Sequence, residues 1–321
     1  MVKIRYIIVF GTFAIASLLA GCSKVSPTGL LVAGSVVEDR VKQSQYYWTN
    51  DTVRGNNGYY YNETEDGDYY YLLGSDPHVV DSLGRIREFF SLMVNDSLVK
   101  AHTEPYVFCS ILGDIVDTQP EFFSKVDWML NDFKAKYKTA FNKELKFYTI
   151  VGNHDITRNG WTMFYSLFGG STYVMIVAFT DASGNPKYDL HIFLDSACAT
   201  LGETQYDKFL IPVLELLGKS EETCRHIMIY THNPFFRSRL ASYSSNFPRE
   251  EFYKLIDTFA NYKVDYVFTG HLHWPGFFEW RGVKYQLLDC FGERNRPQRG
   301  EVYSVHCKGN GEIEVSNIYL K

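Results

Sequence analysis

The stretch LKFYTIVGNHD, residues 145–155, is a short apolar run that leads directly into Asn, His and Asp. A short apolar run that ends in turn-forming residues predicts a buried β-strand. From residue 69 onward, such runs alternate with longer helical patterns, for example at 81–101 and 120–140. This alternation predicts βαβ units, and therefore an α/β fold in which helices cover both faces of an open sheet.

Further runs extend this predicted topology. The segments TYVMIVAFT and YDLHIFLDS flank DASGNPK and predict an antiparallel hairpin. Helical patterns follow near 203–217 and 249–261. The C-terminal part is rich in predicted strands, namely GFFEW, VKYQLLDC, EVYSVHC and IEVSNIYL.

Polar side chains follow five of the predicted strands, at the point where each strand ends. Along the chain they are Asp76 and His78, Asp114 and Asp117, Asn153 with His154 and Asp155, His232, and finally His271 and His273. In an open α/β sheet, ligands bind beyond the carboxyl ends of the strands. We therefore expect these side chains, which are distant in sequence, to converge on one site.

The residue types at these strand ends indicate the chemistry of the site. Asp, His and Asn without Cys suit Mn, Fe or Zn rather than a Cys-based structural zinc. One ion cannot use all of these groups. With one shared carboxylate they fit two ions about 3.5–4 Å apart, which clamp a phosphoryl group and generate hydroxide near neutral pH. Each motif alone also fits an ordinary polar turn, and only their repetition at successive strand ends favours a site.

In this order, the motifs DPH, GDIVD, GNHD, THN and GHLH resemble the signature of the calcineurin-like metallophosphoesterases, over roughly residues 69–290. The resemblance implies a four-layer α/β/β/α sandwich of two mixed sheets flanked by helices. It also implies a phosphodiesterase or phosphatase with two divalent or mixed-valence metal ions, among which Mn, Fe and Zn are not distinguished. A hydroxide held between the ions would attack phosphorus. The alternative is a non-catalytic metal-binding scaffold of the same fold.

The resemblance also assigns metal ligands. The first metal would be bound by Asp76, His78 and His273. The second would be bound by Asn153, His232 and His271, and the bridge between the two metals would be Asp114.

Three further residues take other roles in the resemblance. His154 is expected to face the substrate, where it contacts a phosphoryl oxygen or protonates the leaving group. Asp155 is expected to orient the His154 ring, and Asp117 to lie beside the ligands rather than among them.

The N-terminus has the layout of a secretory signal, because Lys3 and Arg5 precede an apolar run from Tyr6 to Ala20. The run ends in LAGC, residues 19–22, which resembles the lipobox of bacterial lipoproteins, where the cysteine is acylated. The alternative is a transmembrane anchor, but a run of about 15 apolar residues is shorter than the ~20 that span a bilayer.

We therefore expect a lipoprotein signal peptide at 1–21, a tether and N-terminal extension at 22–67, and a metallophosphoesterase domain at 68–321. Lipidation of Cys22 would anchor the protein to a membrane while the domain stays in water. The predicted location is the bacterial cell envelope after export, at the periplasmic face or the outer membrane.

The amino-acid composition limits the kinds of molecule that the protein is expected to bind. The formal net charge of -5 gives no reason to expect a nucleic-acid polymer. The predicted substrate is a small phosphate ester, and the residues leave open whether it is a nucleotide, a phospholipid head group or a sugar phosphate. The oligomeric state is also open. The cysteines beyond residue 22 lack CxxC spacing, so buried reduced thiols are expected, with one disulfide as the alternative.

Overall fold

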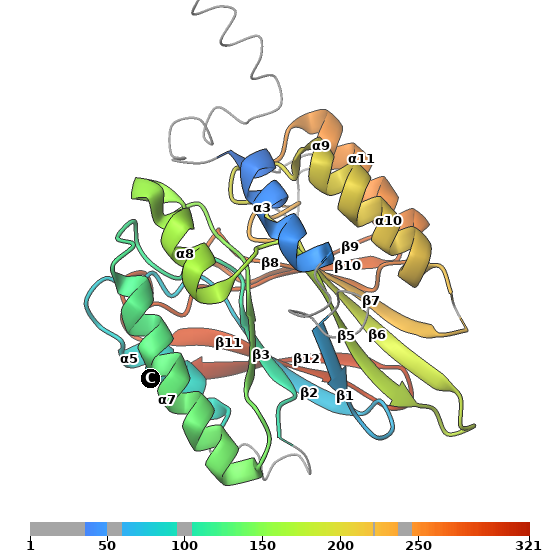
Figure 1. Cartoon of the computed structure of the whole chain (residues 1–321), viewed down its shortest axis with the longest axis horizontal. Coiled ribbons are helices and arrows are strands. Elements are labelled where there is room, and N and C mark those ends of the chain that lie inside the picture. Colours follow the sequence, from blue (N-terminus) through green and yellow to red (C-terminus); the bar gives the residue numbers. More distant parts are fainter. Residues whose placement is uncertain (1–35, 50–59, 95–104, 221, 237–245) are drawn as a thin grey trace, which may run out of the picture.

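The computed structural model describes residues 36–49, 60–94, 105–220, 222–236 and 246–321 (Figure 1). The predicted signal peptide and the predicted lipidation site, Cys22, lie outside these residues and stay predictions. Within the described ranges, every helix is too short or too polar to cross a membrane.

Two mixed β-sheets form the centre of the fold (Figure 1). The larger sheet has seven strands in the spatial order β1 (Tyr60–Glu63), β5 (Tyr173–Thr180), β6 (Pro186–Phe193), β7 (Cys224–Tyr230), β8 (Tyr266–Thr269), β10 (Val283–Leu287) and β9 (Gly276–Trp280). The smaller sheet has five strands in the order β12 (Ile313–Leu320), β11 (Gly300–Cys307), β2 (Tyr69–Gly74), β3 (Phe108–Ile111) and β4 (Lys146–Thr149).

Strand direction decides where the site forms. Strands β2, β3 and β4 run parallel in the smaller sheet, as do β6, β7, β8 and β10 in the larger one. Within each parallel group the carboxyl ends therefore lie at a common edge. Strands β5 and β6 pair antiparallel, which confirms the predicted hairpin.

Helices cover the outer face of each sheet (Figure 1). The smaller sheet is covered by α5 (Gly84–Leu92), α7 (Phe122–Phe141) and α8 (Gly160–Phe168), with the short helix η2 (Thr157–Asn159) before α8. The larger sheet is covered by α9 (Gly202–Gln205), η3 (Tyr206–Leu210), α10 (Ile211–Val213), η4 (Leu214–Gly218) and α11 (Arg249–Asn261). This arrangement confirms the predicted four-layer α/β/β/α sandwich.

Helix α7 shows how the sequence produces these layers. Its buried residues Phe123, Val126, Leu130 and Phe133 recur at spacings of three and four, so that one apolar stripe faces the sheet. The helix ends at Asn142, which has a left-handed φ of 53° and therefore turns the chain out of the helix.

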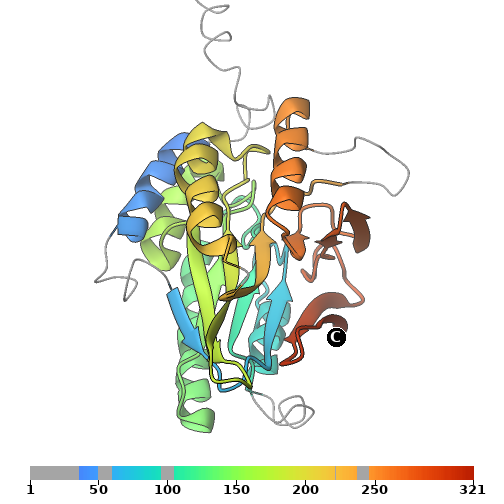
Figure 2. The same cartoon turned by 90° about the vertical axis from the view of Figure 1, so that its right-hand side faces the viewer.

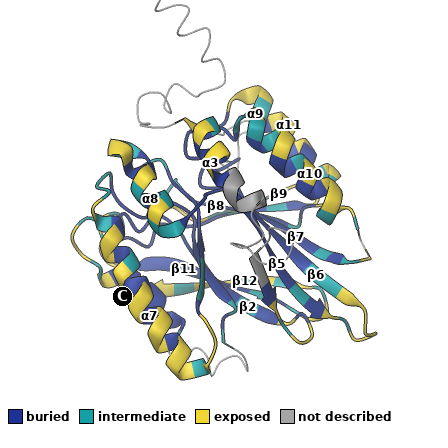
Figure 3. Ribbon diagram, in the orientation of Figure 1, coloured by how far each residue is buried: buried dark blue, intermediate teal, exposed yellow. Residues whose placement is uncertain are grey.

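The core has three apolar layers, one between the sheets and one beneath each set of helices. In β2, Tyr69, Tyr71 and Leu73 join the layer between the sheets, whereas Leu72 joins the layer under the helices. Because side chains alternate along a strand, one buried strand supplies both layers. Figure 3 shows the outcome, with dark blue strands and helices that are yellow on their outer faces.

Two elements that precede residue 68 also pack on the domain. Helix α3 (Val37–Thr49) lies against α9 (Figures 1 and 2), and its buried Arg40 pairs with Asp195 at an Nε–Oδ2 distance of 2.7 Å. Strand β1 pairs in parallel with β5. Loss of either partner would leave the other charge buried and unpaired, at a cost of about 3–5 kcal/mol. Both elements fall in the segment predicted as tether and extension.

The cysteines of the domain are buried and free, as predicted. They are Cys109, Cys198, Cys224, Cys290 and Cys307. Burial raises the pKa of the thiols of Cys224 and Cys290 to about 12. A raised thiol pKa and burial both reduce nucleophilicity, which agrees with a packing role for Cys224 and Cys290.

Candidate metal centre

The polar residues predicted at strand ends converge where the carboxyl ends of both sheets meet. Asp76 and His78 follow β2, Asp114 follows β3, Asn153 follows β4, His232 follows β7, and His271 and His273 follow β8. The strand-end side chains form three groups that could hold a metal ion, namely Asp76, His78, Asp114 and His273; Asp114, His232 and His271; and His78, Asp117 and His154. The first two groups share the carboxylate of Asp114 and are described first. Both sheets therefore contribute to a single centre.

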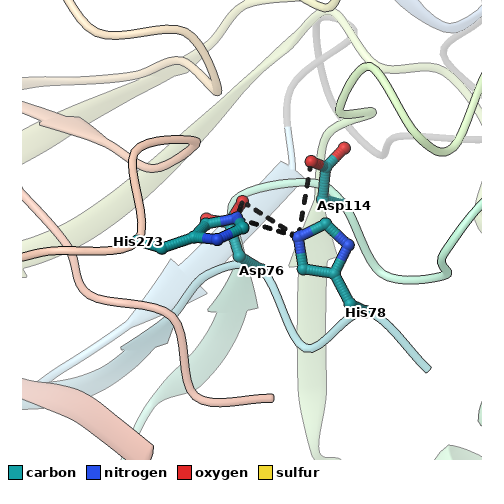
Figure 4. Close-up of side chains that lie close together, drawn as sticks. All are labelled: Asp76, His78, Asp114 and His273. Carbon is teal, nitrogen blue, oxygen red and sulfur yellow. Dashed lines mark hydrogen bonds and ion pairs between the residues drawn. The ribbon is translucent and has the colours of Figure 1, made fainter. Parts of the chain in front are cut away.

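The first group consists of Asp76, His78, Asp114 and His273 (Figure 4). The Nε2 atoms of His78 and His273 face each other at 2.9 Å, and Asp76 Oδ1 lies 3.3 Å from His273 Nε2. Asp76 Oδ1 is buried and accepts no hydrogen bond in the described part of the chain. A buried carboxylate oxygen without a donor costs free energy unless a cation satisfies it, so this group fits a metal ion.

The second group consists of Asp114, His232 and His271, and Asn153 lies among them. Asn153 Oδ1 is 3.1 Å from His232 Nε2 and 2.8 Å from His271 Nδ1. The other nitrogen of His232, Nδ1, lies 2.8 Å from the carbonyl oxygen of Leu112, to which it can donate. That hydrogen bond fixes Nδ1 as the donor, so in the neutral ring Nε2 is the nitrogen that directs a lone pair at the centre, as metal-binding histidines require.

Asp114 is the residue common to both groups. Its Oδ2 lies 3.7 Å from His78 Nε2 and 3.4 Å from His232 Nε2. Its Oδ1 accepts the backbone N–H of His154 at 2.8 Å. One oxygen is therefore fixed by the backbone, and the other is placed between the two sets of histidines.

The backbone at these positions is strained. Asp76, His78, Asp114, His271 and His273 all have φ between 45° and 75°, in the left-handed region that residues other than glycine rarely adopt. Such conformations cost about 1–3 kcal/mol each and persist at functional sites, where the surrounding structure imposes them. Because of this geometry, His271 joins the second group and His273 the first, although regular strand geometry would place them on the same face.

Glycines in the same motifs let the loops approach closely. Gly113 has a φ of 86°, and a Cβ there would lie 2.7 Å from His232 Nδ1. At Gly152, a Cβ would overlap the carboxylate of Asp114. The glycines of GDIVD and GNHD therefore permit close packing of the two loops around Asp114 and His232, since a Cβ at either position would clash with its neighbours.

The two histidines of the second group have opposite pKa shifts. Burial lowers the pKa of His232, but the Asp114 carboxylate outweighs this effect and raises it to about 10. Burial, with the charge on His232, lowers the pKa of His271 to about 4. In the metal-free protein at neutral pH, His232 is therefore charged and His271 neutral.

We expect metal binding to release the proton of His232, because a metal ligand must be deprotonated. The range from pH 6 to 8 lies below the His232 pKa of about 10. Because one proton must leave His232 in this range, the metal association constant should fall about tenfold for each pH unit of acidification. Calorimetric titration with Mn²⁺ in buffers of different ionisation enthalpy measures the released proton directly. Binding without proton release would contradict the assignment of His232 as a ligand.

The imidazole of His232 also makes the stability of the metal-free fold depend on pH. Since the folded pKa of His232 lies above its ordinary value of 6.5, its contribution to stability is complete below pH 6.5 and is lost as the pH rises towards about 10. The slope from one such group is at most about 1.4 kcal/mol per pH unit.

His154 lies at the edge of the centre with its side chain 35% exposed. Its Nδ1 is 2.8 Å from Asp117 Oδ1, and its ring meets the His78 ring edge-on. Asp117 therefore orients this ring, which corrects the expectation that Asp155 does so. Burial lowers the pKa of His154, although the Asp114 carboxylate opposes the effect.

Asp155 points away from His154 and into the protein. Its Oδ2 accepts the N–H of Gly152 at 2.8 Å, and its Oδ1 accepts the N–H of Val116 at 3.0 Å. It thus braces the loop after β4 against the loop after β3. Burial, helped by the charge of Asp114, raises the pKa of Asp155 to about 7, although the backbone donors favour its ionised form.

Three further residues, which the sequence motifs do not include, support the centre. Ser196 Oγ accepts the backbone N–H of His232 at 3.0 Å. Arg296 donates to the carbonyl oxygen of His273 and to Asp289, while the guanidinium of Arg294 contacts Asp117. The three arginines of GERNRPQR, residues 292–299 between β10 and β11, were the available signal for the two arginines. No comparable signal marks Ser196.

Comparison with known proteins places the chain in a family. A family model described as calcineurin-like phosphoesterase matches residues 70–275, which is more than half of the chain. The chain therefore belongs to the calcineurin-like phosphoesterases, and the prediction of a metallophosphoesterase is confirmed. No curated protein matches the sequence.

Solved structures that match the chain share little sequence with it. GAP50, the anchor in the inner membrane complex of Plasmodium, is 13% identical with a TM-score of 0.44, over 79% of this chain and 89% of that one. A dimetal phosphatase from Danio rerio is 12% identical with a TM-score of 0.46, over 79% and 98%. A putative 5'-nucleotidase from Staphylococcus aureus is 12% identical with a TM-score of 0.48, over 79% and 54%.

Proposed function

We propose that this chain is a dinuclear metal-dependent phosphoester hydrolase. The observation that carries the proposal is the shared carboxylate, because Asp114 belongs to both groups of ligand atoms. Asn153 adds a neutral oxygen next to His232 and His271. A set of histidines and carboxylates divided around one common oxygen fits a pair of divalent ions, with Mn, Fe and Zn all suited to it.

Divalent ions in these positions would neutralise charge on the phosphoryl oxygens and generate hydroxide near neutral pH. The chain itself contributes a proton donor. His154 is partly exposed and turns its Nδ1 to Asp117, so that its Nε2 is available to the leaving oxygen of a bound ester. Burial lowers the pKa of His154, whereas the negative charges of Asp117 and of a bound phosphate act in the opposite direction and favour the protonated ring that donates to the leaving group.

The test combines metal analysis with hydrolysis. Purified protein loaded with Mn²⁺, Fe²⁺ or Zn²⁺ is expected to retain two ions per chain and to hydrolyse p-nitrophenyl phosphate or bis(p-nitrophenyl) phosphate. Chelation should abolish the activity and metal addition should restore it. Bound metal without turnover on a wide panel of esters would instead indicate a non-catalytic metal-binding scaffold.

We also propose that the enzyme is an exported lipoprotein of the bacterial envelope, a proposal that the LAGC motif supports. In a bacterial host, wild-type protein is expected to incorporate labelled palmitate and to sediment with membranes, whereas Cys22→Ser should do neither. Hydrolytic activity should survive this substitution, because Cys22 lies far along the chain from the ligands. Palmitate incorporation by Cys22→Ser would contradict the assignment.

A further inference from the structure

Arg294 lies on the loop that follows β10, close to the candidate centre. Its side chain is 60% exposed, and its guanidinium contacts Asp117 Oδ2. The other oxygen of Asp117 lies 2.8 Å from His154 Nδ1 and 4.0 Å from His78 Nδ1. Asp117 therefore links Arg294 to the proposed proton donor, His154, and lies near the candidate ligand His78.

A cavity places the same arginine beside the centre. Arg294 and His78 line a cavity of about 270 Å³ together with Val79, Ser82 and Glu293. The cavity therefore adjoins the arginine and one candidate ligand, His78, whereas the other candidate ligands are not among its lining residues. An exposed arginine paired with one carboxylate is often only a solvated surface pair. Here the carboxylate, Asp117, also lies 2.8 Å from His154 Nδ1, and the arginine lines the same cavity as His78.

We propose that Arg294 makes the site selective for phosphate monoesters over phosphate diesters. This inference rests on the proposed phosphoester hydrolysis. A monoester dianion has three terminal oxygens and a diester monoanion has two, so a monoester presents one further charged oxygen. Arg294 offers this oxygen N–H donors in a planar fork, which suits phosphate better than a point charge does.

Arg294 takes no part in bond making. In the reaction, a bond forms between the oxygen of water and phosphorus, and the bond from phosphorus to the ester oxygen breaks. The departing alkoxide receives a proton from His154, which is replenished by the proton that water loses. The products are an alcohol and inorganic phosphate, and the arginine holds a terminal oxygen throughout.

Binding experiments test this assignment without turnover. In calorimetric titrations of Mn²⁺-loaded protein, Arg294→Gln should weaken binding of inorganic phosphate about 10- to 100-fold, the usual effect of losing a charge-assisted contact. Binding of dimethyl phosphate should change less than about threefold, since that anion lacks the third terminal oxygen. Arg294→Lys, which keeps the charge without the fork, should lie between wild type and Arg294→Gln.

Arg281 provides a matched control, because it is 50% exposed and pairs with one carboxylate, Asp257, at the opposite end of β10. Arg281→Gln should leave both anions unaffected, and metal content should be equal in all variants. In kinetic assays, kcat/KM of Arg294→Gln should fall for p-nitrophenyl phosphate but not for bis(p-nitrophenyl) phosphate.

Equal weakening of both anions by Arg294→Gln would overturn the inference and leave Arg294 with the role of holding Asp117. Unchanged phosphate binding would overturn it as well. If the proposed function were wrong, the wild-type protein would hydrolyse neither ester. The two titrations would still decide the role of Arg294 in that case.

Discussion

Asp114→Ala is expected to remove both bound ions and to reduce turnover by at least about 10³-fold. The reason is geometric, since Asp114 Oδ2 lies within 3.7 Å of a histidine from each group and no other carboxylate belongs to both of them. Its loss would leave His78 and His232 without the anion that holds them together. Metal content after dialysis and initial rates at saturating metal measure the two effects.

Asp114→Ala also removes the acceptor of the His154 backbone N–H, and an unsatisfied buried donor costs about 1–3 kcal/mol of stability. Asp114→Asn separates the two consequences, because it keeps an acceptor and the shape of the side chain but lowers its value as a ligand. It should fold like wild type and still bind metal poorly. Asp132→Asn, at an exposed pair on α7, is the matched control and should change nothing. Two tightly held ions in Asp114→Asn would contradict the bridging role.

The positions of the candidate ligands could be predicted because they depend on features that are close together in the sequence. Each motif ends a buried parallel strand, and parallel strands bring their carboxyl ends to a common edge whatever the details of the loops. The glycine before Asp114 and the one before Asn153 permit close approach of the two loops. Strand, glycine and ligand are adjacent in sequence, so their arrangement in space follows from a few residues.

The partner of His154 could not be predicted in the same way. Asp155 is its neighbour in sequence, yet its carboxylate is turned to the N–H groups of Gly152 and Val116. Asp117 reaches the ring from a different loop, in which Asp114 and Thr118 have positive φ. Such backbone angles are imposed by tertiary packing, and residue type alone does not reveal them.

The contacts of α3 and of the loop after β10 show the same limit. Arg40 and Asp195 are 155 residues apart, and neither lies in a motif. Arg294 and Arg296 stand out only as a cluster of charge, which most often belongs to solvated surface. Pairing over such distances follows from the assembled layers, so the structure was needed to assign these residues.

His154→Ala is expected to lower turnover about 10²- to 10⁴-fold, the range for loss of a general acid, while metal content stays intact. His154 contributes its backbone N–H to Asp114, which alanine retains. Its ring belongs to a separate group with His78 and Asp117, and not to the two groups that share Asp114. The ions should therefore remain in place. Metal analysis and rates on the same preparation compare the two quantities.

A comparison of esters with different leaving groups tests whether His154 acts as a general acid. An alkyl phosphate needs protonation of its alkoxide, whereas p-nitrophenolate departs without help. His154→Ala should therefore be far more damaging for an alkyl phosphate than for p-nitrophenyl phosphate. Asp117→Asn, which weakens the hydrogen bond that orients the ring, should show the same dependence on the leaving group with a smaller loss. An equal loss on both esters would assign His154 to binding of the phosphoryl oxygens, and loss of metal from His154→Ala would make it a ligand.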